Sequence, residues 1–153
     1  MGSYFFDSSA LAKLYQSETG SDRVEAIFRE PQRRIIISRL TAVEMHSVFA
    51  GRIRMGTLST IDAEALRNHF LNDVATGVLV VVAIADRHYG KAERLLRDYG
   101  SAHRLRTLDA LQLAVALDVN SRDSLDALVA ADNVVCQVGA AEGLAITNPE
   151  NPS

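Results

Sequence analysis

Residues 4–15 read YFFDSSALAKLY, and this stretch sets the pattern on which we expect the whole fold to be built. The aromatic run at residues 4–6 is typical of a short strand, whereas SALAKLY is typical of a helix, with Leu11 and Leu14 three residues apart. A carboxylate, Asp7, stands between the two. A strand that ends in an acid and leads directly into a helix favours a fold in which strands and helices alternate.

The rest of the chain repeats this alternation. Four further strand-like runs, RRIIIS, VLVVVAI, DALVAA and LAITNP, end at residues 38, 84, 131 and 149. Further helical segments span residues 21–30, 41–56, 59–74, 86–100, 107–119 and 132–143. The order predicts an α/β fold, a three-layer α/β/α sandwich around a mostly parallel five-stranded sheet. We expect one domain over residues 1–147 and a loose tail over residues 148–153.

The composition is that of an ordinary folded domain. The chain has 153 residues, of which 48% are hydrophobic and 23% charged, and its formal net charge is −3. A negative balance argues against a protein that coats nucleic acid through a global positive field. The longest apolar run, residues 78–85, is too short to span a bilayer, and no signal-peptide pattern opens the chain. The single cysteine, Cys136, fits a reducing compartment, so we expect a cytoplasmic protein with no membrane partner.

Four acids are predicted to lie at one edge of the sheet or within one helical turn of it. Asp7 and Asp132 follow strands, Asp109 opens the apolar helix TLDALQLAVAL, and Glu44 falls in the first turn of TAVEMHSVFAG. Ligands of parallel sheets bind at the carboxyl ends of the strands, which is where these acids fall. Each also has a structural alternative: the aspartates as helix caps or helix-terminus charges, and Glu44 as the partner of Thr41 in a capping box.

The combination of the four acids points to a metal site. The helix after Asp109 has hardly any polar face, so its packing draws that carboxylate inward. Two carboxylates ~4 Å apart repel by ~4 kcal/mol at an effective dielectric constant of ~20, so four of them need protons or cations to coexist. Oxygen ligands without His or Cys suit Mg²⁺ or Mn²⁺. Such a cation can activate water and polarise a phosphoryl oxygen, which favours hydrolysis of a phosphodiester.

Four segments carry a resemblance to a known family: YFFDSSALAKLY, TAVEMHSVFAG, LRTLDALQLAVAL and ALVAADNVVCQVGAAEGLAITNP. Together they resemble the PIN-domain ribonucleases, and among those the VapC-type toxins of bacterial toxin–antitoxin pairs. The resemblance implies a sheet order of 3-2-1-4-5, with Asp7 at the end of the central strand. It also implies a metal-dependent endoribonuclease that cleaves RNA and is restrained by a separate antitoxin protein. Pairing of two copies through the helix at residues 59–74 is a further expectation.

The resemblance also implies roles for individual acids. The catalytic residues would be Asp7, Glu44, Asp109 and Asp132. Of these, Asp7 and Asp109 would bind Mg²⁺ or Mn²⁺ directly, and Glu44 and Asp132 would bind it directly or through water. Ala130 stands where family members often carry a hydroxyl residue, and we expect weaker support around the metal there.

Several polar residues near the acids are candidates for contact with RNA or phosphate: Ser8, Lys13, Arg104 and Arg106. The two arginines precede the helix of Asp109 and could meet an RNA backbone at the rim of the site. The plainer alternatives are helix capping for Ser8 and Ser9 and a solvated helix face for Lys13.

The remaining polar residues are expected to have structural roles or weaker links to RNA. Arg52 and Arg54 are less favoured candidates for an RNA contact. His46 is expected at the surface or in packing, and Gln112, where the family often has His, is interpreted as helix packing.

Two other functions fit the same residues. A housekeeping RNA-processing nuclease would keep the fold and the metal. A non-catalytic PIN-like domain that only binds protein or RNA would keep the fold alone.

Overall fold

The structure, a computed structural model, describes residues 2–151, which form five strands and seven helices. All neighbouring strands are parallel, and their order is β3-β2-β1-β4-β5, the order that the family resemblance implies. The central strand therefore leads into Asp7. The strands are β1 (Ser3–Phe6), β2 (Arg34–Ser38), β3 (Leu79–Val82), β4 (Ala127–Val129) and β5 (Ile146–Thr147).

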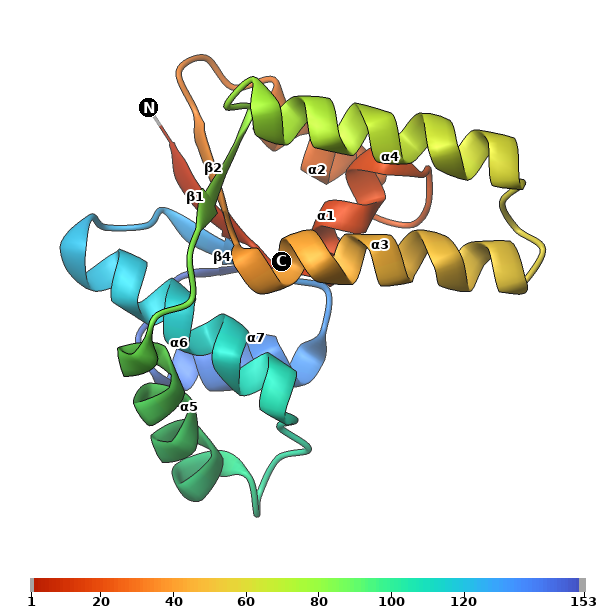
Figure 1. Ribbon diagram of the computed structural model, residues 1–153. Helices are drawn as coiled ribbons and strands as arrows, with labels where there is room; N and C mark the ends of the chain where they lie inside the picture. Colours follow the sequence, from red (N-terminus) through yellow and green to blue (C-terminus); the bar gives the residue numbers. More distant parts are fainter. Residues whose placement is uncertain (1, 152–153) are drawn as a thin grey trace.

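Helices cover both faces of the sheet, which makes the expected three layers. The first four helices share one hydrophobic core with one face of the sheet, and the last three share a second core with the other face. In Figure 1 the α3–α4 pair runs out to one side of the molecule, away from α5, α6 and α7. The helices are α1 (Ser8–Tyr15), α2 (Ser21–Phe28), α3 (Arg39–Arg54), α4 (Thr60–Ala75), α5 (Asp86–Tyr99), α6 (Thr107–Arg122) and α7 (Asn133–Ala141).

The aromatic run of β1 is explained by burial on both faces. Phe5 packs into the core beneath α5, α6 and α7, while its neighbour Phe6 packs into the core beneath α1 to α4. Both side chains are fully buried, and the Phe6 ring meets the Phe28 ring edge-on at 5.5 Å. Consecutive side chains of a strand point to opposite faces, so a central strand needs an apolar residue at each position. Because Phe6 is the last residue of β1, the Asp7 carboxylate that follows it lies at the carboxyl edge of the sheet.

The start of α3 differs from the sequence prediction. The helix begins at Arg39, two residues before Thr41, because Ser38 at the end of β2 caps it by accepting the Thr41 N–H at 3.1 Å. Glu44 therefore lies in the second turn rather than the first. The predicted capping box of Thr41 and Glu44 is wrong.

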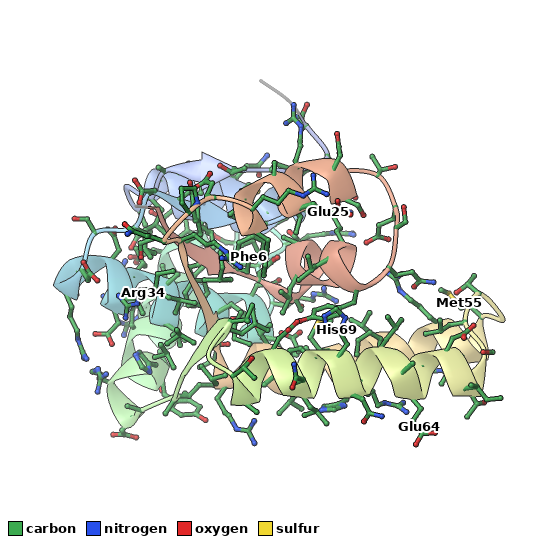
Figure 2. The ribbon with its side chains drawn as sticks, turned by 90° about the horizontal axis from the view of Figure 1, so that it is seen from above. Phe6, Glu25, Arg34, Met55, Glu64 and His69 are labelled. Carbon is green, nitrogen blue, oxygen red and sulfur yellow. The ribbon has the colours of Figure 1, made fainter. Side chains whose placement is uncertain are left out.

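Helix α4 buries a carboxylate beside its apolar residues. Phe70 and Asp73 are buried, whereas Leu71 is 49% exposed. The Tyr15 hydroxyl donates a hydrogen bond of 2.7 Å to the Asp73 carboxylate, which fastens the end of α1 to α4. Figure 2 shows His69 of α4 on the side that faces α1, where its ring lies 5.3 Å from Tyr15.

The end of the chain returns towards α1. The Lys13 ammonium bonds to Glu150 at 2.6 Å, and Asn148 hydrogen-bonds to Asn133 at the start of α7. The last two residues of the segment expected to be loose, 152 and 153, lie outside the described residues. Within the part of the chain that the structure describes, no helix is long and apolar enough to cross a membrane.

Candidate active site

The four predicted acids are carried by four different helices. Asp7 follows β1 and is the N-cap of α1, and Asp132 is the N-cap of α7, which follows β4. Asp109 is the third residue of α6, and Glu44 lies in the second turn of α3. Helix N-termini of a parallel α/β fold gather at the carboxyl edge of its sheet, which explains how residues so distant in sequence approach one another.

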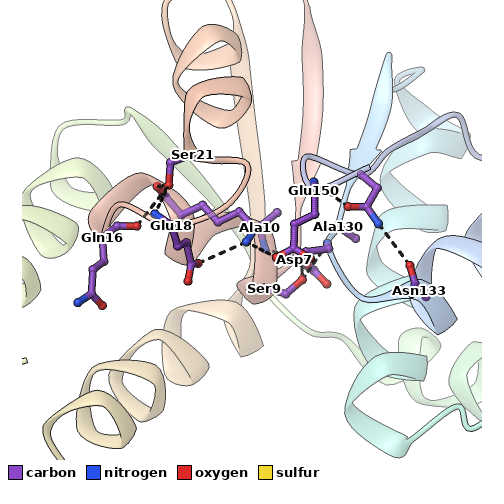
Figure 3. Close-up of polar contacts among 12 residues, drawn as sticks. Asp7, Ser9, Ala10, Gln16, Glu18, Ser21, Ala130, Asn133 and Glu150 are labelled. Carbon is purple, nitrogen blue, oxygen red and sulfur yellow. Dashed lines mark hydrogen bonds and ion pairs between the residues drawn. The ribbon is translucent and has the colours of Figure 1, made fainter. Parts of the chain in front are cut away.

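Each aspartate fastens its own helix through one oxygen. Asp7 Oδ1 accepts the Ala10 N–H at 3.0 Å and the Ser9 hydroxyl at 2.6 Å, as Figure 3 shows. Asp132 Oδ1 accepts two backbone N–H groups of α7, and Asp109 Oδ2 accepts the Arg106 N–H at 3.1 Å. The capping alternatives therefore describe real contacts. They leave the second oxygen of each aspartate without a hydrogen bond from residues 2–151.

The four acids also interact electrostatically, each with two of the others. The negative charges of Asp132 and Glu44 both raise the pKa of Asp7. The charge of Asp109 raises the pKa of Glu44, and that of Asp132 raises the pKa of Asp109. The fold therefore brings all four acids into one cluster.

Burial is the main cause of the raised pKa values. Asp7 is only 6% exposed, and burial raises its pKa to about 7 against the opposing effect of its two hydrogen bonds. Burial likewise raises the pKa of Glu44, opposed by the hydrogen bond from Gln112. It raises the pKa of Asp109, opposed by the Arg106 N–H. The edge of the sheet thus holds acids whose ionisation is costly, which is common at functional sites.

Two open recesses lie against this cluster and share Asp109 and Arg106. The larger, of about 540 Å³, reaches from His103 and Arg104 to Asp132, and the smaller, of about 420 Å³, includes Glu44. The Arg106 guanidinium is largely exposed, and its Nε lies 3.6 Å from Asp109. Two arginines at the rim of an acidic recess suit a ligand that carries negative charge.

The chemistry of the donor set fits a hard divalent cation, because all four groups are carboxylates and three keep an unbonded oxygen. As the side chains stand, however, no three Asp, Glu, His or Cys residues within 2–151 are grouped closely enough to hold a metal ion. The capping hydrogen bonds account for this, since each aspartate is turned towards its own helix. A cation would have to draw the free oxygens together.

Ser9 is a site residue whose role the sequence left open between capping and ligand contact. Its hydroxyl donates to Asp7 and accepts the Ala131 N–H at 3.0 Å, so it joins the end of β1 to the loop before Asp132. Ala130, which stands where the resembled family often carries a hydroxyl residue, is fully buried. A hydroxyl therefore still links the two strand ends, but it comes from α1.

We expect Ser9→Ala to lower the free energy of unfolding by about 1 kcal/mol, because Asp7 and the Ala131 N–H both lose a partner. Urea denaturation at pH 7 measures this change. Ser17→Ala is the control, because Ser17 is exposed. Equal stability of the two variants would contradict the bridging role.

Gln112 is the second polar residue whose part the sequence did not reveal. It was interpreted as helix packing, but its amide donates a hydrogen bond of 2.9 Å to Glu44. One signal was present, since Gln112 is the only polar residue in the run ALQLAVAL of α6. A lone amide in an apolar helix needs buried partners.

The other candidates lie as follows. Ser8 opens α1 and borders a recess with Glu44. Lys13 is only 3% exposed, and its ammonium is bound by Glu150 and by Glu18, the latter at 3.5 Å. The prediction that Lys13 lies on a solvated helix face is therefore wrong, and its ammonium is not free to bind a phosphate.

Arg52 lies two turns beyond Glu44 and pairs with Glu18 at 3.1 Å, away from the acids. His46, an exposed residue, contacts the Phe70 ring at 6.0 Å, in keeping with a packing role.

Comparison with known proteins relates this site to a family. A family model described as PIN domain matches residues 4–141. Ribonuclease VapC45 of Mycobacterium tuberculosis (strain CDC 1551 / Oshkosh) is 33% identical over 116 residues, which is 75% of this chain and 75% of the relative.

Solved structures share the fold at low sequence identity. Mycobacterium tuberculosis VapC20, described as a Sarcin-Ricin loop cleaving toxin, matches with a TM-score of 0.67 at 15% identity, over 93% of this chain and 96% of its own. VapBC2 of Rickettsia felis, solved with a DNA fragment from its promoter, matches with a TM-score of 0.63 at 14% identity, over 95% and 98%.

Proposed function

The chain belongs to the PIN domain family, and from this premise we propose that it is the ribonuclease toxin of a toxin–antitoxin pair. It would hydrolyse RNA phosphodiesters with the help of Mg²⁺ or Mn²⁺ in the cytoplasm. The observation that carries the proposal is the position of Asp7, Glu44, Asp109 and Asp132 at one edge of the sheet, where the last three line two recesses that share Asp109. The fold gathers costly negative charge at one place, and divalent cations relieve that cost.

The chain's own residues suggest how RNA would be held. Arg104 and Arg106 at the rim would bind backbone phosphates and offset the repulsion between the acids and the substrate. Asp7 and Asp109 would hold the cation through the oxygens that do not serve their helices. The Glu44 oxygen that does not bind Gln112 would orient the attacking water. A bound divalent cation would lower the pKa of water and stabilise the charge that builds on the phosphate.

Removal of divalent cations tests the proposal directly. We expect purified protein to cleave total RNA with Mn²⁺ or Mg²⁺, to stop when EDTA is added, and to resume when Mg²⁺ is in excess. Since water is the expected nucleophile, the products should carry no 2′,3′-cyclic phosphate. Asp109→Asn, purified in the same way, controls for contaminating nucleases and should be inactive. Cleavage that persists in EDTA, or that the variant shares, would refute the metal-dependent nuclease.

One observation favours a second candidate, a domain that binds a partner without catalysis. As its side chains stand, the described part of the chain has no group of three potential metal ligands. Calorimetric titration with Mn²⁺ separates the two functions, because a binding-only domain would show no saturable site.

We further propose two partners for the chain, an antitoxin protein and a second copy of the chain. Several structural relatives were solved as toxin–antitoxin complexes, which supports an antitoxin partner here. Ile61 and Leu71 on α4 and Met55 after α3 are exposed apolar side chains on the projecting helix pair. They support contact with a second copy of the chain.

A further inference from the structure

Gln112 is buried at the junction of three elements. It lies on α6, one turn after Asp109, and is 5% exposed among apolar neighbours. Its Oε1 accepts the Ser38 hydroxyl at 2.7 Å at the end of β2. Its Nε2 donates to the Thr41 hydroxyl and, at 2.9 Å, to the Glu44 carboxylate, both on α3. The side chain therefore connects the end of a central strand, α3 and α6.

The contacts of Gln112 use both ends of its amide. A buried amide is costly unless its carbonyl and its N–H groups are bonded, and here the carbonyl has one donor and the N–H groups have two acceptors. Packing alone would be served as well by Met or Leu at this position. The polar side chain is thus explained by its partners, and among these Glu44 is the one that borders a recess of the active site.

Glu44 needs such a restraint more than the three aspartates do. Each aspartate is held by the backbone of its own helix, whereas Glu44 lies in the second turn of α3, beyond the free N–H groups of the helix start. A glutamate side chain also has more rotamer freedom to lose than an aspartate. The Gln112 amide ties it to the helix that carries Asp109.

We propose that Gln112 is a positioning residue that holds the Glu44 carboxylate beside Asp109 for metal binding and hydrolysis. This inference rests on the proposed nuclease function. Gln112 touches neither substrate nor cation in the proposal and acts only through Glu44. Its removal should therefore weaken Mn²⁺ binding and turnover while RNA binding by the rim arginines persists.

The test compares Gln112→Met with Tyr15→Phe in the full chain. Met keeps the length of the side chain but cannot donate to Glu44. Tyr15→Phe is the matched control, because it also removes a donor from a carboxylate, that of Asp73, without touching the four acids. We expect Gln112→Met to lower Mn²⁺ affinity or kcat by about 10- to 100-fold with KM for RNA unchanged. Tyr15→Phe should lose stability only.

The outcomes separate this inference from the proposed function. Wild-type Mn²⁺ affinity and kcat in Gln112→Met, or equal losses in Tyr15→Phe, would overturn the positioning role. If the wild-type chain neither binds Mn²⁺ nor cleaves RNA, the nuclease proposal fails. The crystal structures of the wild type and Gln112→Met then still decide the inference: a displaced Glu44 carboxylate supports it, and an unmoved one overturns it.

Discussion

Replacing Asp7 by asparagine is expected to abolish RNA cleavage and, at the same time, to make the fold more stable at pH 8. The loss of activity follows from the removal of one charge that would hold the cation. Metal ions contribute several kcal/mol to the stabilisation of a transition state, so a loss of ~4 kcal/mol corresponds to a rate about 1000-fold lower. Cleavage of total RNA by the purified variant measures the rate. Growth of a bacterial host that expresses it without antitoxin measures toxicity.

The gain in stability follows from the sign of the pKa shift. Burial raises the pKa of Asp7 in the folded state to about 7, above its ordinary value of 3.8. The protonated form therefore favours folding, and wild-type stability falls as the pH rises from about 4 through about 7. Asparagine keeps the oxygen that caps α1 but carries no charge. We expect its melting temperature at pH 8 to exceed that of the wild type by several degrees, and the difference to vanish near pH 4.

Two controls make the Asp7 prediction specific. Asp22→Asn makes the same chemical change at an exposed position in the first turn of α2; it should leave cleavage unchanged and should not raise the melting temperature, because it removes a favourable helix-terminus charge. Added Mg²⁺ should raise the melting temperature of the wild type but not that of Asp7→Asn, because a ligand stabilises only the state that binds it. Full cleavage activity in Asp7→Asn would contradict the assignment of the site.

The parallel sheet followed from features that act locally or along a single strand, whereas its strand order came from the resemblance to the PIN-domain family. Apolar runs such as VLVVVAI show burial on both faces, and the alternation with helices requires parallel strands. The start of α3 did not follow, because Ser38 and Thr41 are both residue types that commonly cap helices. The choice depends on where β2 leaves the sheet, and Ser38 still pairs with Val82 of β3. Register with a neighbouring strand is not written in the local sequence.

The sequence likewise predicted some features of the site and not others. The acids at the strand ends could be located, because an Asp between a strand and a helix is recognisable in sequence and the fold then gathers such positions. Lys13 could not be placed, since its partner Glu150 lies 137 residues further along the chain. Nor did the sequence show that each aspartate would bind its own helix through one oxygen and leave the other without a hydrogen bond from residues 2–151. Such details depend on side-chain contacts between elements that meet only in the folded chain.

Truncation of either buried aromatic residue of β1 should have the largest effect on stability. We expect Phe5→Ala and Phe6→Ala each to lower the free energy of unfolding by about 3–5 kcal/mol, because each opens a cavity in a closely packed core. For a chain of this size the melting temperature would fall by about 10 °C. Thermal and urea denaturation measure both changes, and Phe6→Leu should recover much of the loss.

The pair of phenylalanines tests the three-layer arrangement itself, because their side chains enter different cores. In a sheet with one solvent-exposed face, one of the two truncations would be nearly neutral. Tyr4→Ala is the internal control, since Tyr4 at the same strand is only partly buried and its hydroxyl bonds to Glu30. Its cost should be clearly smaller than that of either phenylalanine. A mild effect at Phe5 or Phe6 would mean that helices do not cover both faces of the strand that leads to Asp7, and the burial that raises the pKa of Asp7 would lose its structural cause.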